Sequence, residues 1–207
     1  RRMRIVFIGC VESSMRLLRR VLEVPEAKVV GIVTRRSSSF NADFRSLEPL
    51  ADKHEIPCYI DTGNDQDDLA DWVRARNPEV GYCFGWSYLL KPEVLALPEL
   101  GFIGFHPTKL PQNRGRHPII WALALGLDET ASTFFFMDVG ADSGDLLHQR
   151  TVPIHWSDDA RDLYDRILDV AAEQVAAFTS QLAAREHQRT PQNDDQANYW
   201  RKRSYED

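Results

Sequence analysis

Short apolar runs alternate with helical segments along the first half of the chain, and this alternation constrains the fold more than any other feature. The apolar runs before residue 85 lie at residues 3–9, 28–34, 57–60 and 79–84. Helical segments are predicted between them at residues 11–24, 47–53 and 67–76. The first run, MRIVFIG, is almost continuously apolar, which is typical of a strand covered on both faces. The alternation therefore predicts an α/β fold, Rossmann-like and doubly wound, with a mostly parallel sheet.

The pattern changes after residue 101. A strand at residues 102–106, a loop at 107–118 and a helix at 119–125 come first. Two further strands, at residues 132–137 and 146–153, are separated by eight residues, too few for a helical crossover. We therefore expect these strands to be antiparallel neighbours near the C-terminal end of the sheet. The last predicted element is an amphipathic helix at residues 158–185.

The composition fits one globular domain of ordinary size. The chain has 207 residues, is 43% hydrophobic and carries a formal net charge of −6. An acidic chain has no uniform basic field to hold a phosphate backbone, so nucleic acid is a disfavoured partner. No segment reaches the roughly 20 consecutive apolar residues that a membrane span needs. Three cysteines without paired spacing predict reduced thiols, and we expect a cytoplasmic protein.

A histidine ends the strand at residues 102–106. Pro107 follows His106, which favours extended backbone and directs the ring out of the end of the sheet. Histidine is suited to proton transfer, or to donating a hydrogen bond to a developing negative charge. A structural histidine with satisfied hydrogen bonds explains the same position, so the residues alone leave both interpretations open.

An acidic turn follows the strand at residues 132–137. Gly140 and Gly144 allow a close backbone approach to a ligand, and Asp142 lies between them. A carboxylate there could orient a neighbouring imidazole or accept a proton through water. An aspartate that only caps its own turn is the alternative. Spacing alone does not choose among Asp138, Asp142 and Asp145.

A basic loop precedes the helix at residues 119–125. Arg114, Arg116 and His117 lie close to the expected start of that helix, where free N–H groups favour anions. A phosphate or carboxylate of a substrate would suit this loop, and a solvated basic loop is the alternative. The chain has no GxGxxG fingerprint and no P-loop, and its His and Cys spacings predict no metal site.

Several segments together resemble the 10-formyltetrahydrofolate-dependent formyltransferase family, which includes methionyl-tRNA formyltransferase and the sugar N-formyltransferases. The central pair of motifs is FHPTKLPQNRGRHPIIWALALG followed by MDVGADSGDLL. The opening IVFIGCVESSMRLLRRVLE is similar to the family's first strand and helix. The segment FGWSYLLKPEVLALPELGFIGFHPTKLP resembles its strand, cofactor loop and H-P-S-L-L-P segment. The ending YWRKRSYED resembles a segment that follows the core domain in sugar-modifying members.

The resemblance implies an N-formyltransferase, a one-carbon group-transfer enzyme that moves a formyl group from 10-formyltetrahydrofolate to a primary amine. Residues 1–187 would form the catalytic domain with the formyltransferase fold. Residues 188–207 would form a tail that contacts substrate or a partner subunit, as in a homodimer. His106 takes the family's histidine position and Asp142 its aspartate position.

The family's catalytic asparagine falls at Gly104, which has no side chain to donate a hydrogen bond. An amide donor of this kind is worth roughly 10²- to 10³-fold in rate. We expect another residue to replace it, with Asn113 and His117 on the following loop as candidates, and we nominate Asn113. A larger role for His106, or a slow or inactive enzyme, would also account for the glycine.

The resemblance also implies binding residues. It places the folate between the loop at residues 84–90 and the turn at 138–142. The predicted cofactor-binding residues are Phe84, Gly85, Trp86, Leu89, Leu90, Asp138, Val139 and Gly140. The predicted acceptor-binding residues are Thr108, Lys109, Arg114, Gly115, Arg116, His117, Tyr199 and Arg201.

The acceptor is predicted to be a nucleotide-activated amino sugar. The sequence lacks the C-terminal β-barrel domain of methionyl-tRNA formyltransferases and the phosphate loop of glycinamide ribonucleotide members, whereas the sugar-type ending is present. Within this class, the short chain resembles enzymes acting on pseudaminic-type amino-dideoxy sugars. One alternative is a formyltransferase acting on another small amine or on tRNA. The other is a non-catalytic folate- or sugar-binding homologue, which Gly104 would permit.

Overall fold

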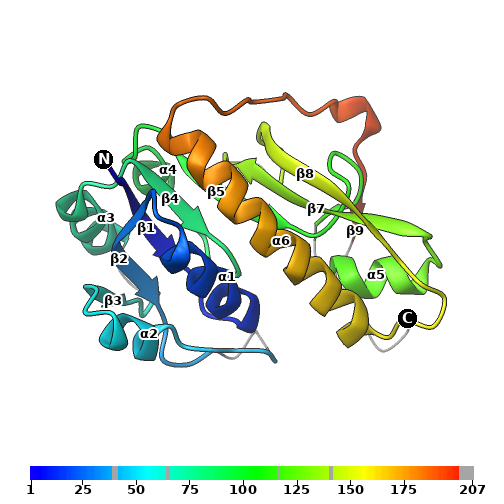
Figure 1. Ribbon diagram of the computed structural model, residues 1–207, viewed down its shortest axis with the longest axis horizontal. Helices are drawn as coiled ribbons and strands as arrows, with labels where there is room; N and C mark the ends of the chain where they lie inside the picture. The colour runs from blue at the N-terminus through cyan, green and yellow to red at the C-terminus, as the bar shows by residue number, and fades with distance from the viewer. Residues whose placement is uncertain (39–41, 64–65, 116, 140–141, 201–207) are drawn as a thin grey trace. The chain divides into compact units, whose positions relative to one another are not determined.

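The computed structural model describes residues 1–38, 42–63, 66–115, 117–139 and 142–200, with the backbone alone for residues 199 and 200. The chain divides into two compact units (Figure 1). The first unit comprises Arg1–Ile103 and Val175–His187, and the second comprises Gly104–Gln174 and Gln188–Asp207. Gly140, Arg116 and Arg201 lie outside the described residues.

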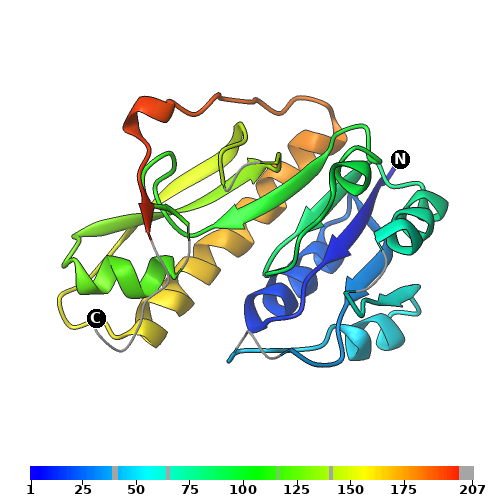
Figure 2. The same ribbon diagram turned by 180° about the vertical axis from the view of Figure 1, so that it is seen from behind.

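The first unit is built from alternating strands and helices. Its elements are β1 (Met3–Ile8), α1 (Glu12–Glu23), β2 (Ala27–Thr34), α2 (Glu48–Lys53), β3 (Cys58–Ile60), α3 (Gln66–Arg76), β4 (Val80–Cys83) and α4 (Pro92–Leu95). β1 pairs in parallel with both β2 and β4, and β2 pairs in parallel with β3. The helix α1 covers one face of these strands (Figures 1 and 2). The strand order therefore reverses beside β1, at the boundary between β1 and β4.

Close backbone contacts fix the carboxyl ends of β1 and β4. The N–H of Cys10 donates to the carbonyl of Gly85 at 3.2 Å, and the Ser14 hydroxyl donates to the carbonyl of Phe84 at 2.5 Å. A Cβ atom on Gly9 would lie 2.4 Å from the carbonyl oxygen of Phe84, so this approach requires glycine. The start of α1 therefore anchors the segment that follows β4. Ligands bind most often at such a reversal of strand order in open α/β sheets.

The second unit contains the antiparallel part of the sheet. Its elements are the end of β5 (Phe102–His106), β6 (Arg114–Gly115), α5 (Pro118–Ala124), β7 (Glu129–Phe136), β8 (Leu146–Pro153), most of α6 (Ala160–Ala183), a 3₁₀ turn η1 (Asp194–Gln196) and β9 (Tyr199–Trp200). β7 and β8 are antiparallel, as predicted. Val152 of β8 and Leu163 and Ile167 of α6 form a buried cluster.

The predicted fold class is confirmed. Seven strands form one mixed sheet in the order β3-β2-β1-β4-β5-β7-β8. The prediction missed a second, two-stranded sheet, in which β6 and β9 pair in parallel (Figure 2). Each of these strands has two residues, too few to show an alternating pattern. The pairing joins loop 107–118 to the tail.

Gly104 in β5 is required by packing. The residue is buried, and a Cβ atom on it would lie 2.7 Å from Cζ of Phe135 and 3.1 Å from Cγ of Met137. Phe135 is itself 6% exposed. The ring of Phe135 on β7 therefore occupies the space that a side chain at position 104 would need.

Replacing Gly104 with alanine should lower the free energy of unfolding by about 1 to 3 kcal/mol, the usual cost of overpacking a core. Urea denaturation measures this change. The double variant Gly104→Ala with Phe135→Leu should recover part of the loss relative to Phe135→Leu alone, because the shorter side chain vacates the contact. Equal costs of Gly104→Ala in both backgrounds would contradict the packing explanation.

Candidate functional site

His106 is buried at the end of β5, with a partner for each ring nitrogen. Its Nε2 lies 2.9 Å from the carbonyl oxygen of Asn113, and its Nδ1 lies 3.5 Å from Oδ2 of Asp142. A carbonyl oxygen only accepts hydrogen bonds, so Nε2 carries a proton in this arrangement. The other nitrogen is then the one that can exchange a proton with the carboxylate. The residue is 5% exposed, so the ring is fixed rather than free to rotate into solvent.

Asp142 completes this pair from the turn between β7 and β8. Its Oδ2 accepts a hydrogen bond from the backbone N–H of Gly115 at 3.1 Å, in addition to facing His106. The residue has a φ angle of 59°, in the left-handed region that aspartate tolerates better than most residues. Among the three candidate aspartates, Asp142 is the one in contact with the histidine. Asp138 accepts from the Ser143 hydroxyl, and Asp145 pairs with Arg189.

Left-handed backbone conformations concentrate at this site. Asn113 and His117 have φ angles of 59° and 56°, and Gly115 between them has a φ angle of 110°. Clustered unusual backbone angles are typical of functional sites, where the surrounding structure holds them. The chain turns sharply at these positions, which brings the Asn113 carbonyl to His106 and the Gly115 N–H to Asp142.

Polar contacts from β7 and β8 hold the first half of loop 107–118. The Thr133 hydroxyl donates to the carbonyl of Thr108 at 2.6 Å. The side-chain amide of Gln149 donates to the carbonyl of Leu110 at 3.0 Å and to the Thr133 hydroxyl at 2.9 Å. Thr133 is fully buried. The loop is therefore tied to the sheet immediately before it reaches Asn113.

Asn113, the predicted replacement donor, lies in contact with the histidine through its backbone. Its side-chain Oδ1 accepts a hydrogen bond from Nδ2 of Asn198 at 3.0 Å. Its own Nδ2 group has no hydrogen-bond partner among the described residues, so both of its N–H donors are available. The other candidate, His117, is the N-cap residue of α5. The replacement of the missing donor stays a prediction.

The predicted acceptor-binding residues differ in their surroundings. Thr108 is buried and donates to the carbonyl of Gln112, and Lys109 forms an ion pair with Glu129 at 3.5 Å. Arg114 is 3% exposed and forms an ion pair with Asp194 at 2.7 Å. Its positive charge is thus already paired within the chain, and a role in binding an acceptor stays a prediction. For Tyr199 the structure describes the backbone pairing with Arg114.

The predicted cofactor loop after β4 belongs to the first unit. Phe84 and Leu90 are buried, and Gly85 has a φ angle of 76°. The ring of Trp86 packs edge-on against Tyr88, with centroids 5.1 Å apart. The Nε1 atom of Trp86 is buried and has no hydrogen-bond partner among the described residues. A buried N–H is rarely left unpaired, so this donor fits a loop that receives a polar ligand.

Of the remaining predicted cofactor residues, Asp138 and Val139 belong to the second unit. Val139 is 86% exposed, and Asp138 is exposed beside Ser143. In the first unit, Leu89 is 74% exposed. Leu89 and Val139 thus each present an apolar side chain to solvent within their own unit.

Sequence reasoning missed the residues that hold the site from the tail. Gln192 and Asn198 bond to the loops that carry Asp142 and Asn113. Both lie in a polar segment rich in Asn, Gln and Asp, in which apolar residues do not recur at helical or strand spacing. Hydrogen bonds from these side-chain amides to distant loops cannot be found in a sequence without knowing that the segments meet.

Neither the cysteines nor a cluster of metal-binding side chains forms a second candidate site among the described residues. The three cysteines are free, and burial raises the pKa of the Cys10 and Cys58 thiols to about 11, so both stay protonated at neutral pH. In the described part of the chain, no group of three or more His, Cys, Asp or Glu residues could hold a metal ion. None of the helices there is long and apolar enough to span a membrane.

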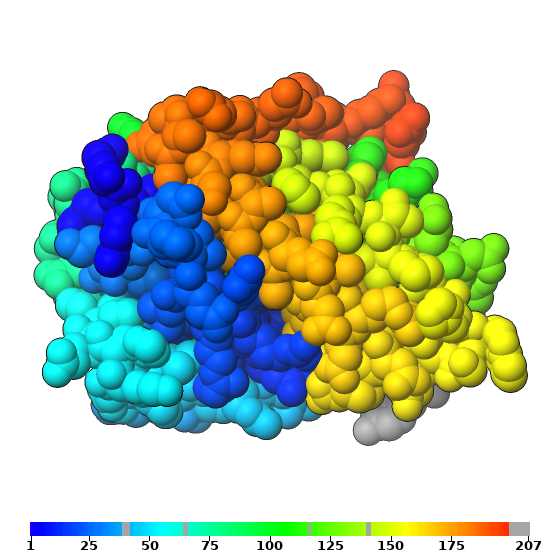
Figure 3. All heavy atoms as spheres, in the orientation of Figure 1, coloured from blue at the N-terminus to red at the C-terminus, as the bar shows by residue number. Residues whose placement is uncertain are grey.

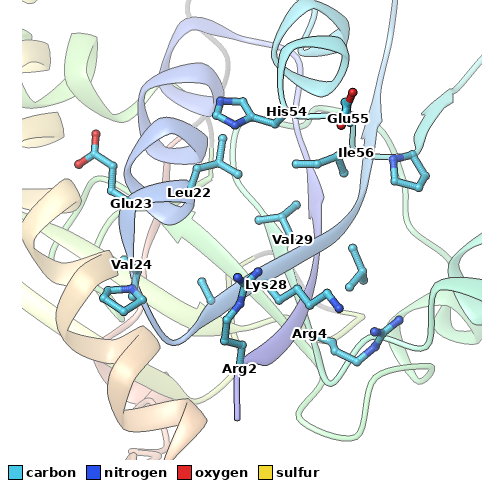
Figure 4. Close-up of a pocket in the computed structure, with 14 residues that line it drawn as sticks. Arg2, Arg4, Leu22, Glu23, Val24, Lys28, Val29, His54, Glu55 and Ile56 are labelled. Atoms are coloured by element: carbon cyan, nitrogen blue, oxygen red, sulfur yellow. The ribbon is translucent and has the colours of Figure 1, made fainter.

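A cavity of about 610 Å³ lies in the first unit, at the amino ends of β1 and β2 (Figure 4). Arg2, Arg4 and Lys28 line it together with Glu23 and Glu55. In Figure 3 the dark blue N-terminal residues lie on the surface beside the blue atoms of α1. The cavity includes none of the residues predicted for catalysis or binding.

Comparisons with known proteins agree on one family. The family model described as Formyl transferase matches residues 3–179. A methionyl-tRNA formyltransferase of Citrifermentans bemidjiense is 33% identical over 185 residues, which cover 87% of this chain and 58% of that protein. A second, from a Cyanothece species, is 32% identical, with 95% of this chain and 60% of that protein covered. The chain thus spans about 60% of the length of the curated relatives it matches.

Solved structures share the fold. Glycinamide ribonucleotide transformylase 1 from Geobacillus kaustophilus superimposes with a TM-score of 0.76 at 21% identity, covering 88% of this chain and all of that one. An N-formyltransferase from Helicobacter canadensis, solved in complex with folinic acid and dTDP-3-aminofucose, has a TM-score of 0.71 at 16% identity, with 96% of this chain and 70% of that chain covered. The family match extends over most of the chain and includes both His106 and Asp142. By this match the chain belongs to the formyl transferase family.

Proposed function

We propose that this chain transfers a formyl group from 10-formyltetrahydrofolate to the primary amine of a nucleotide-linked amino sugar. The observation that carries the proposal is the contact between His106 and Asp142, 3.5 Å apart, in a chain of the formyl transferase family. An imidazole fixed beside a carboxylate can accept and release protons without reorienting. That is the property which amide formation at an amine requires.

His106 and Asp142 would act as one proton-carrying pair. An amine that attacks a formyl carbon must lose a proton, and the departing nitrogen must gain one. Asp142 is the half-buried member of the pair, with its carboxylate held by the Gly115 N–H. Asp142 can take the proton that the amine loses, directly or by relay to Nδ1 of His106, and the pair then returns one proton to the departing nitrogen. Nδ1 of His106 and Oδ2 of Asp142, between which this proton would pass, are 3.5 Å apart.

Asn113 would stabilise the negative charge that develops on the formyl oxygen. Asn198 holds the side-chain oxygen of Asn113, which leaves the Nδ2 hydrogens as the free end of the amide. Preorganised donors of this kind stabilise developing charge because they need no rearrangement during the reaction. The proposal thereby accounts for the loss of a donor at Gly104.

The cofactor would supply the formyl group, and the loop after β4 would bind it through Trp86. The Nε1 atom of Trp86, which has no hydrogen-bond partner in the described part of the chain, would donate to the ligand. Leu89 of the same loop, which is 74% exposed, would provide an apolar contact. The complexes of the Helicobacter canadensis protein support this class of cofactor.

The acceptor is proposed to be an amino sugar linked to a nucleotide, with a pseudaminic-type sugar as the narrower form of the proposal. The net charge of −6 and the resemblance of residues 199–207 to sugar-modifying members support this choice. A second candidate is methionyl-tRNA, which the 33% identity to a methionyl-tRNA formyltransferase favours.

An amine panel should separate the two acceptors. Incubation with 10-formyltetrahydrofolate and either dTDP-3-aminofucose or methionyl-tRNA would be followed by mass spectrometry of the acceptor. We expect a formyl group on the amino sugar and none on the tRNA. Formylation of the tRNA alone would overturn the acceptor proposal, and binding of folinic acid without turnover on any amine would indicate a non-catalytic homologue.

The variant Asp142→Asn should lower kcat by roughly 10²- to 10⁴-fold, the range for a lost general acid or base. Asparagine keeps the left-handed backbone and an oxygen for the Gly115 N–H, so the fold should be unchanged by circular dichroism. The matched control is Asp145→Asn in the same turn, for which we expect less than a threefold change. A comparable loss in the control would mean that charge in the turn, and not the contact with His106, determines the rate.

The variant Asn113→Gly should lower kcat by roughly 10²- to 10³-fold, because glycine removes the amide but adopts the same backbone angles freely. Steady-state kinetics with saturating cofactor measures this effect. The adjacent Gln112→Ala serves as the control, since its side chain has no hydrogen bond among the described residues. An unchanged kcat for Asn113→Gly would exclude Asn113 as the replacement donor.

A further inference from the structure

The tail returns to the site through residues of the second unit. Thr190 pairs with Leu146 at the start of β8, and β9 pairs with β6 (Figures 1 and 2). Between these two anchors lie Gln192 and Asn198, whose amides contact both catalytic loops. We infer that residues 188–200 are an integral part of the active site, in which Gln192 and Asn198 are positioning residues for Asp142 and Asn113. This inference rests on the proposed function for the roles of those two residues.

Gln192 links a buried cation to the turn that carries Asp142. Its Oε1 accepts hydrogen bonds from Nε and Nη2 of Arg114, at 3.2 and 3.0 Å. Its Nε2 donates to the carbonyl oxygens of Asp142 and Gly144, at 2.7 and 2.6 Å. A primary amide has two donors and one oxygen with two lone pairs, so all of its hydrogen-bonding capacity is used.

The bonds to Gln192 explain how the guanidinium of Arg114 can be buried. A buried guanidinium is costly unless its donors are satisfied, and here Gln192 and Asp194 of the tail accept from its Nε and Nη2 atoms. Arg114 begins β6, and the next residue, Gly115, donates its N–H to Asp142 Oδ2. Gln192 therefore bonds both to the turn that carries Asp142 and to Arg114, the neighbour of Gly115 in β6. These bonds fix the distance between the two partners of the Asp142–Gly115 hydrogen bond.

Asn198 performs the corresponding task for Asn113. Its Oδ1 accepts from the backbone N–H of Asn113 at 3.0 Å, and its Nδ2 donates to the side-chain oxygen of Asn113 at 3.0 Å. Its carbonyl accepts from the N–H of Arg114 at 2.8 Å. The Asn198 side chain thus holds both the backbone N–H and the side-chain oxygen of Asn113, and the backbone carbonyl of Asn113 in turn meets His106.

These contacts predict a site ordered by polar bonds and not by apolar burial. Asn193, Asp194, Asp195 and Gln196 of the tail are exposed, and Gln192 is half-buried. Segments with exposed hydrogen bonds and few apolar contacts open at low free energy. Loss of the Gln192 contacts should therefore loosen the Asp142 turn while the sheet stays intact.

The test compares Gln192→Met with Gln196→Met. Methionine keeps the length of the side chain but removes every hydrogen bond, and Gln196 is an exposed glutamine of the same tail without a side-chain bond among the described residues. The direct readout is amide hydrogen exchange at Gly115, whose N–H bonds Asp142. Exchange at Gly115 should be faster by about tenfold or more in Gln192→Met and unchanged in Gln196→Met, with the same circular dichroism spectrum for both.

Kinetics provides the second readout. With dTDP-3-aminofucose and 10-formyltetrahydrofolate, Gln192→Met should lower kcat by roughly 10- to 100-fold, because small misplacements of reacting groups are that costly, and should leave KM for the cofactor within about threefold. A second variant, Asn198→Ala, should lower kcat in the same way. Gln192→Glu keeps the acceptor for Arg114 but loses both donors, so it should behave as Gln192→Met does.

The outcomes separate the inference from the proposed function. Unchanged exchange at Gly115 in Gln192→Met would overturn the positioning role whatever the activity. Faster exchange with unchanged kcat would show a tail that only stabilises structure, and would also overturn it. If the wild-type chain formylates no amine while exchange responds as expected, the proposed function fails and the linkage of the tail to the Asp142 turn stands.

Discussion

The site depends on the carboxylate of Asp142, whose Oδ2 meets the N–H of Gly115 at 3.1 Å and faces Nδ1 of His106 at 3.5 Å. Neither contact follows from regular secondary structure. Each needs a loop that turns through left-handed backbone conformations, at Asp142 on one side and at Asn113 on the other. Such conformations persist where surrounding contacts over-determine them. In this chain those contacts come from Thr133 and Gln149 beneath the loop and from the tail above the turn.

The packing of Gly104 shows how fold and chemistry compete for the same space. A side chain at this position would meet the ring of Phe135 at 2.7 Å, so the buried aromatic strand β7 and a donor at position 104 exclude one another. The chain keeps the aromatic core, and in the proposed function the donor is the amide of Asn113, nine residues further along in a loop held by the tail. In the proposed function the tail therefore holds the donor in place, because no side chain projects from β5 at position 104.

The fold was largely predictable because its signals are local. The apolar run at residues 3–9 and the later apolar runs that alternate with helices predict parallel strands. The eight-residue gap before Leu146 predicts the antiparallel pair. The candidate aspartate was not predictable from spacing, since Asp138, Asp142 and Asp145 share one turn. Family resemblance selected Asp142, and the contact with His106 agrees with that selection. The pairing of β6 with β9 and the amide contacts of Gln192 join segments about 80 residues apart, and no local pattern encodes them.

The most direct test of this account is a crystal structure of the chain with a non-transferable analogue of 10-formyltetrahydrofolate that carries the formyl group at the N10 position. The account predicts that the formyl oxygen lies within hydrogen-bond distance of Nδ2 of Asn113, with the His106–Asp142 contact retained beside it. Such a structure would place the donor where Gly104 supplies none. A formyl group bound away from Asn113 and His106, or a ligand held without contact to either residue, would contradict the account.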